Sequence, residues 1–191
     1  MKSSQVHTDV LAALLQEGDT SAFRTLFDRF RPSVHAYCAR MLGDRDEAED
    51  AAQETFIHAL RDAPGLRSPE RFRGWLFGIA RHRVMMILRE RRKAMLEKFD
   101  DDVWDDETPL TMAERSEIQL NVRNAVAALS PAYREVVLLR DFQHLSYAEI
   151  AIATESTEIA VKSRLHKARK ALVATLTPIF GEEDANEMRG V

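Results

Sequence analysis

The sequence predicts an all-α protein made of two small helical domains joined by an acidic linker. Three observations favour this fold class. Only seven glycines and six prolines interrupt the 191 residues, residues of high helix propensity dominate, and apolar residues recur at helical spacing along most of the chain. A hydrophobic content of 45% is ample for a packed core.

Two helices are expected at the start of the chain. The first covers residues 8–17 and ends near Gly18. The second covers residues 20–42 and carries apolar side chains at helical spacing. Pro32 is expected to kink or interrupt it, and Gly43 to end it.

Two further helices complete the expected first domain. Residues 46–62 form an acidic-starting helix, and residues 63–65 a loop. Ser68 is expected to cap a long helix that has Pro69 in its first turn and runs to about Lys93. The side chains expected to face inward from residues 46–62 are Ala51, Ala52, Phe56, Ile57 and Leu60.

The chain then changes character. FDDDVWDDETP is acidic and shows little apolar periodicity, which is typical of an exposed linker. Helices are expected again over residues 112–129 and from Ser130 to about Phe142. The predicted division is a domain over 1–95, a linker over 96–111, a second domain over 112–177 and an acidic tail over 178–191.

The segment LSYAEIAIATESTEIAVKSRLHKAR predicts two short helices joined by a tight turn. Ser146 and Glu149 form a capping-box pattern at the start of the first, and Ser156 or Thr157 can cap the second. The second helix has a buried stripe of Val161, Leu165, Ala168 and Leu172. Off that stripe lie Lys162, Ser163, His166, Lys167 and Lys170. This helix suits the DNA major groove, and the alternative is an amphipathic helix with a solvated basic face.

The predicted long helix, SPERFRGWLFGIARHRVMMILRERRK, combines aromatic and basic residues. A core face is expected from Phe72, Trp75, Leu76, Ile79, Ala80 and Ile87. A basic surface, flanked by Trp75 and Phe77, is expected from Arg73, Arg81, His82, Arg89 and Arg92. Aromatic rings among arginines suit opened nucleic acid, because bases stack on rings while phosphates pair with arginine. For Phe72 and Trp75 a plain core role is the favoured alternative.

Charge is distributed in blocks, so the net charge of −4 is misleading. Residues 66–93 carry +7, residues 97–117 carry −7 and residues 44–54 carry −5. Segregated blocks indicate separate surfaces for separate partners.

Several classes of protein are disfavoured. The single cysteine, Cys38, excludes an internal disulfide and fits a reducing cytoplasm. His35 and Cys38 lie one turn apart, but two candidate ligands make no closed metal site. No signal peptide, membrane span, phosphate-binding loop or catalytic constellation is evident. We therefore expect a cytoplasmic, non-enzymatic protein without metal or cofactor.

Four segments together resemble the bacterial extracytoplasmic-function (ECF) sigma factors of the sigma-70 superfamily. They are GDTSAFRTLFDRF, DEAEDAAQETFIHALR, FRGWLFGIARHR and LSPAYREVVLLRDFQHLSYAEIA with VKSRLHKAR. The match spans about residues 18–173 in the family's order and spacing. The resemblance implies a factor that directs core RNA polymerase to promoters, commonly of a stress or envelope-response regulon.

The resemblance also implies partners and roles for particular residues. The partners are the β′ clamp helices and β flap of core RNA polymerase, promoter DNA and an anti-sigma factor. Docking on the clamp is implied for Asp50, Gln53 and Glu54. Contacts to the −10 element are implied for Arg67, Phe72, Arg73, Trp75, Phe77, Arg81 and His82, with residues 65–68 near a flipped base. Contacts to the −35 element are implied for Lys162, Ser163, Arg164, His166, Lys167 and Lys170.

The sequence departs from the family pattern at a few positions. His82 stands where the family usually has Asn, and Ile159 and Ala160 stand where Gly and Thr are common. Glu155 occupies a turn that usually contains Gly, so another form of turn is an open alternative. Two other functions are alternatives: a sequence-specific repressor, and a decoy that titrates another factor. A repressor would need neither the acidic nor the basic-aromatic helix, and a decoy would not need the basic face near Lys167.

Overall fold

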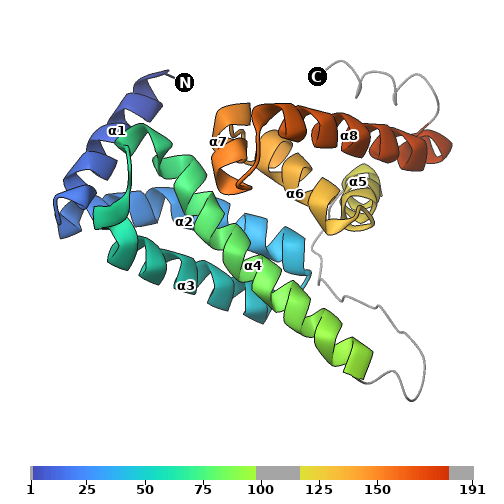
Figure 1. Cartoon of the computed structure of the whole chain (residues 1–191). Coiled ribbons are helices and arrows are strands. Elements are labelled where there is room, and N and C mark those ends of the chain that lie inside the picture. The colour runs from blue at the N-terminus through green and yellow to red at the C-terminus, as the bar shows by residue number, and fades with distance from the viewer. Residues whose placement is uncertain (1, 98–116, 181–191) are drawn as a thin grey trace.

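The computed structural model describes residues 2–97 and 117–180, and every regular element among them is helical (Figure 1). The first unit contains α1 (Lys2–Gln16), α2 (Thr20–Leu42), α3 (Arg45–Asp62) and α4 (Phe72–Glu97). Two 3₁₀ turns, Ala63–Gly65 and Pro69–Arg71, connect α3 to α4.

The second unit contains α5 (Glu117–Ala127), α6 (Pro131–Val137), α7 (Tyr147–Ala153) and α8 (Glu158–Phe180). A π-helical turn, Leu138–Phe142, extends α6. The predicted all-α class with a C-terminal helix-turn-helix is confirmed. Most of the predicted linker, from residue 98 on, and most of the predicted tail, from residue 181 on, lie outside the described residues.

Local signals set several helix ends. The Asp19 carboxylate caps α2 by accepting hydrogen bonds from the backbone N–H groups of Ser21, at 2.7 Å, and Ala22, at 3.2 Å. A hydrogen bond from the Ser21 hydroxyl, followed by these two backbone bonds, lowers the pKa of Asp19. Gly43 ends the helix at φ 72°, a left-handed conformation that glycine adopts without steric cost.

Three local predictions are corrected by the structure. α2 is continuous through Pro32, so of the two expected outcomes the interruption is absent and the kink stays a prediction. The Ser68 side chain makes no capping bond, although Pro69 does open a helical turn. α4 continues to Glu97, which takes it past the predicted end at Lys93 and into the predicted linker.

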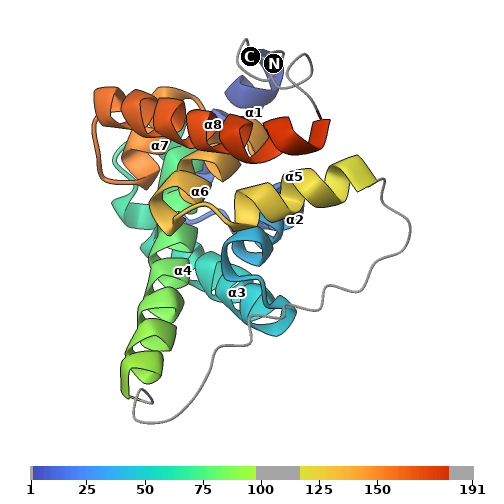
Figure 2. The ribbon, with the colours of Figure 1, turned by 90° about the vertical axis from the view of Figure 1, so that its right-hand side faces the viewer.

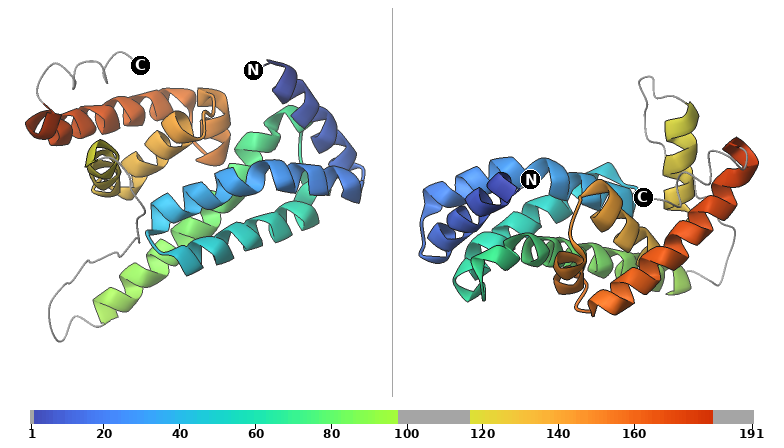
Figure 3. Two further views of the ribbon diagram at one scale, coloured as in Figure 1. Left: turned by 180° about the vertical axis from the view of Figure 1, so that it is seen from behind. Right: turned by 90° about the horizontal axis from the view of Figure 1, so that it is seen from above.

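The two units lie against each other along one half of α4. α2 packs on both α3 and α4 within the first unit, and α7 packs on α4 from the second. The other half of α4 projects away from the second unit (Figures 1 and 2). Seen from behind and from above, α6, α7 and α8 lie along one side of the first unit (Figure 3).

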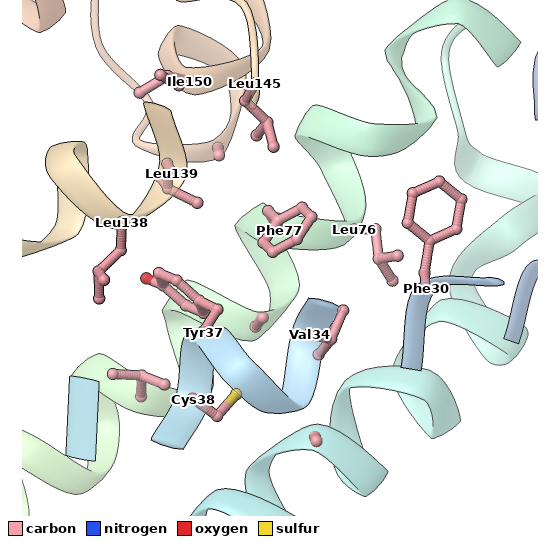
Figure 4. Close-up of a cluster of buried hydrophobic side chains, with 14 of the residues drawn as sticks. Phe30, Val34, Tyr37, Cys38, Leu76, Phe77, Leu138, Leu139, Leu145 and Ile150 are labelled. Atoms are coloured by element: carbon pink, nitrogen blue, oxygen red, sulfur yellow. The ribbon is translucent and has the colours of Figure 1, made fainter. Parts of the chain in front are cut away.

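A continuous hydrophobic core crosses the boundary between the units. Tyr37 of α2 and Phe77 of α4 are buried, and their rings meet edge to face at 5.8 Å. Figure 4 shows Phe77 between Tyr37 and side chains that come from the second unit. The buried second-unit side chains of this cluster include Leu138, Leu139, Leu145 and Ile150.

Candidate nucleic-acid interface

The helix-turn-helix begins with the predicted capping box. The Ser146 hydroxyl accepts a hydrogen bond from the backbone N–H of Glu149 at 3.2 Å. The Glu149 carboxylate accepts one from the backbone N–H of Ser146 at 2.7 Å. Both orphan donors at the start of α7 are thereby satisfied.

The turn between α7 and α8 is left-handed despite lacking glycine. Glu155 has φ 50°, a conformation that costs a side-chain-bearing residue about 1–2 kcal/mol. The backbone N–H of Ser156 donates to the Ala151 carbonyl at 2.9 Å, which closes the turn. Thr157 supplies the cap of α8, because its hydroxyl accepts the backbone N–H of Ala160 at 3.2 Å. The turn therefore takes a left-handed form with Glu155 in it.

α8 presents the basic face that the sequence predicted. Val161, Leu165 and Ala168 are buried, which confirms most of the stripe. The exposed residues on the other side are Lys162, Ser163, His166, Lys167 and Lys170. Arg164 differs from them, since it is half-buried and its charge opposes the rise that burial causes in the pKa of Glu135. Arg164 therefore faces the protein interior more than solvent.

A shallow hollow of about 560 Å³ lies beside this face. Its lining includes Tyr147, Lys162, His166 and Lys170. The Lys162 ammonium lies 5.2 Å from the centroid of the Tyr147 ring, and the Arg140 guanidinium lies 4.7 Å from it. The Lys162 and Lys170 cations that line this open hollow favour an anionic ligand such as a phosphate backbone.

The aromatic residues of α4 are placed mainly in the core. Phe72 is buried against Phe30, with ring centroids 5.6 Å apart, and Trp75 is half-buried, so the favoured alternative holds for Phe72 and largely for Trp75. Phe77 is only 1% exposed, so its predicted position beside a surface is wrong. Its neighbours across the unit boundary could not be inferred from α4 alone.

Two arginines of α4 contact the second unit. Arg73 donates to the Glu149 carboxylate at 3.2 Å and to the Gln143 carbonyl at 3.0 Å. Arg81 donates to the buried Glu135 carboxylate at 2.5 Å. Burial raises the pKa of Glu135, and the Arg81 charge opposes that rise. The predicted basic surface is thus partly covered by the protein's own carboxylates.

The remaining predicted −10 residues are accessible. Arg67 lies in the loop after α3 and is exposed, and so is His82 in the middle of α4. Arg89 and Arg92 are exposed along the projecting half of that helix. This part of the expected basic surface is open to solvent.

The predicted docking residues all lie on α3, but they differ in whether their side chains are exposed or paired. Asp50 and Gln53 are exposed, whereas Glu54 forms an ion pair with Arg83 of α4. Ile57 and Leu60 were expected to face inward, yet they are 57% and 44% exposed. Gln53, Ile57 and Leu60 are spaced four and three residues apart, so all three lie on one face of α3. This spacing is the sequence signal that indicates their shared exposure.

That face borders an apolar groove between α2 and α3 of about 370 Å³. The groove is lined by residues that include Phe23, Phe27, Gln53, Ile57 and Leu60. Polar residues at its edge and apolar residues within it are typical of a surface that binds another protein.

The described residues hold no group of three or more potential metal ligands. Cys38 is buried, and burial raises the pKa of its thiol to about 12. No helix in residues 2–97 or 117–180 is long and apolar enough to cross a membrane.

Comparison with known families gives two matches. Residues 26–94 match sigma-70 region 2, and residues 119–172 match sigma-70 region 4. The residues between the two matches, 95–118, include the stretch predicted as a linker, 96–111.

Similar proteins and structures agree with these matches. RNA polymerase sigma-H factor of Pseudomonas aeruginosa is 30% identical over 94% of this chain and 98% of its own length. The ECF RNA polymerase sigma factor SigL of Mycobacterium tuberculosis is 32% identical over 83% of this chain and 90% of its own.

Two solved structures are also similar. CnrH, solved in complex with the cytosolic domain of CnrY, is 25% identical, with a TM-score of 0.68 over 90% of this chain and 98% of its own. RpoE of Bartonella quintana, in complex with the anti-sigma factor NepR, shares the fold at 22% identity, with a TM-score of 0.69 over 81% of this chain and 96% of its own. With region 2 and region 4 both matched and relatives aligned over nearly their full length, the chain belongs to the ECF family of RNA polymerase sigma factors.

Proposed function

We propose that this sigma factor places α8 on the −35 element, uses α4 at the −10 element and docks on core RNA polymerase through α3. The observation that carries the proposal is the exposed basic face of α8. α8 follows α7, which begins with a complete capping box, and the turn between them. The chain supplies contacts and no active site of its own, and it acts in the cytoplasm, where polymerase and chromosome meet.

The α8 face suits duplex DNA for electrostatic and geometric reasons. Lys162, Lys167 and Lys170 are exposed and can neutralise phosphates, which positions the helix but does not read sequence. Ser163 and His166 lie between them and carry hydrogen-bonding groups that suit base edges in the major groove.

The α3 face suits a protein partner with basic and apolar groups. Asp50 and Gln53 offer exposed polar contacts, and Ile57 and Leu60 offer apolar area beside the groove. Such a combination favours docking on the polymerase clamp, since acidic side chains steer a basic partner and apolar ones supply affinity.

The α4 surface and the loop before it suit the opened −10 element. Arg67 and His82 are exposed, and extruding a base costs a few kcal/mol that stacking and phosphate contacts must offset. An anti-sigma protein is a further proposed partner. The complex of the related CnrH with the cytosolic domain of CnrY supports it.

The docking assignment is tested by combining Asp50→Arg with Gln53→Ala. Both residues are exposed, so the fold should persist while co-purification with core polymerase is lost. A charge reversal at the exposed Glu17, in the turn after α1, is the control. Undiminished association of the double variant would reject the α3 assignment, and no association of the native chain would favour a repressor acting through α8 alone.

A further inference from the structure

The first turn of α8 carries a large apolar side chain that lies almost wholly in solvent. Ile159 is the second residue of the helix, and its side chain is 80% exposed. Among the described residues, no other large apolar side chain is as exposed. An apolar side chain gains free energy when it leaves water, so a ligand that covers Ile159 would gain affinity from it.

Ile159 lies near the centre of the basic face of α8, which runs along the outer edge of the second unit (Figure 1). An α-helix turns by about 100° per residue, which places Ser163, His166 and Lys170 within about 40° of the direction of Ile159. These three side chains are exposed, whereas Ala168, on the opposite side of the helix, is buried. Ile159 therefore shares the surface that is proposed to meet duplex DNA.

The start of α8 suits base edges better than phosphates. A helix N-terminus attracts phosphate through its free backbone N–H groups. Here the Thr157 hydroxyl accepts the backbone N–H of Ala160 at 3.2 Å, and the side chains of Glu155 and Glu158 are exposed on either side of this cap. Their two negative charges repel a phosphate. Ile159 is thus left to face a base, as the first residues of recognition helices do.

A docking site for another protein is the alternative, and the surroundings of Ile159 do not favour it. Protein interfaces depend on clusters of apolar and aromatic side chains. In the described helices α7 and α8, the other exposed large apolar side chain is Ile179, which lies about 30 Å further along α8. A single apolar side chain among lysines suits a polyanionic ligand that presents one small apolar group.

Duplex DNA presents such a group at each thymine. The base edges in the major groove carry hydrogen-bond donors and acceptors, and the thymine 5-methyl group is the apolar exception. The Ile159 side chain has no donor or acceptor, so that methyl group is the one with which it can gain affinity. Branching at Cβ holds an isoleucine in a helix to one main rotamer, so little side-chain freedom is lost on contact.

We propose that Ile159 is a specificity-determining residue of the duplex-binding surface: its side chain covers the 5-methyl group of one thymine in the −35 element. This role builds on the proposed placement of α8 at that element. The lysines of the same face supply affinity through phosphates, which carry no sequence information, and Ile159 discriminates thymine from the other bases.

Replacing thymine by deoxyuridine tests this contact, because it removes the methyl group and keeps the hydrogen-bonding groups of the base. The full chain first selects a duplex from a random library, and each thymine is then replaced in turn. One replacement should weaken binding by the native chain by about fourfold, the value of one buried methyl group. In Ile159→Ala the same replacement should leave binding almost unchanged. The salt dependence of this variant should match that of the native chain, since no phosphate contact is lost.

Ile179→Ala is the matched control. It makes the same truncation on the same helix, at a side chain that is 49% exposed and remote from the first turn. This variant should keep the native sensitivity to thymine replacement. Both positions are exposed, and alanine has a higher helix propensity than isoleucine, so both variants should fold like the native chain, which circular dichroism checks.

Three results would overturn the assignment. The first is equal thymine sensitivity in the native chain and in Ile159→Ala, or none at any thymine, which would leave the −35 role of α8 intact. The second is normal duplex binding by Ile159→Ala with loss of transcription by core RNA polymerase, which would show that the side chain contacts a protein. The third is failure of the native chain to select any duplex, which would contradict the −35 role itself.

Discussion

Replacing Phe77 by alanine separates a core role from a DNA-stacking role for this side chain. Phe77 is 1% exposed and meets Tyr37 edge to face at 5.8 Å, and it shares its buried cluster with Leu139 and Leu145 of the second unit (Figure 4). Truncation of a buried Phe costs about 3–5 kcal/mol. Because the ring bridges two units, the closed packing cannot collapse around the cavity without moving one of them, so a value near the middle, about 4 kcal/mol, is expected.

Urea denaturation followed by circular dichroism measures this loss. With a slope near 2 kcal/mol per molar urea, the midpoint should fall by about 2 M. Phe142→Ala is the matched control, because that ring is 38% exposed and its loss should cost about 1 kcal/mol. A Phe77→Ala midpoint within about 0.5 M of the native value, together with lost single-strand binding, would refute the reasoning and restore the surface role that the sequence suggested.

Three further predictions concern other parts of the chain. Lys167→Ala and Lys170→Ala should each reduce the salt slope of duplex binding by about 0.9, whereas Arg164→Ala, at a half-buried position, should change it little; equal slopes in all three would contradict the placement of α8. Ser146→Ala should lower the free energy of unfolding by about 1 kcal/mol, and a thermal melt within error of the native one would argue against the capping box. The Cys38 thiol loses its proton near pH 9 when unfolded but near pH 12 when folded, so its contribution to stability is complete below pH 9 and lost as pH rises towards 12, by up to about 1.4 kcal/mol per unit. The urea midpoint should therefore fall more between pH 8 and pH 10 in the native chain than in Cys38→Ala. An equal fall in both proteins would contradict this contribution of the Cys38 thiol.

Local and periodic features of this protein could be predicted from its sequence. The capping box at Ser146 and the buried stripe from Val161 to Ala168 depend on residues within a few positions of each other, and the structure has both. The stop at Gly43 follows equally from local conformation. Such signals need no knowledge of the partner surface.

The arrangement of the two units could not be predicted in the same way. Arg73 and Arg81 pair with carboxylates 76 and 54 residues away, and a basic pattern on α4 does not distinguish a phosphate from such a carboxylate. Phe77 is buried by the same long-range contacts. Ile57 and Leu60 differ in the opposite direction, because an apolar side chain on α3 is not by itself a buried one.

Run-off transcription with a bacterial core RNA polymerase and genomic DNA fragments tests the assignment most directly. The native chain should produce discrete start sites that are absent with core polymerase alone. The Asp50→Arg, Gln53→Ala double variant should produce none, while the Glu17 control should match the native chain. Transcripts that do not depend on the added chain, or that the double variant supports equally well, would contradict the account.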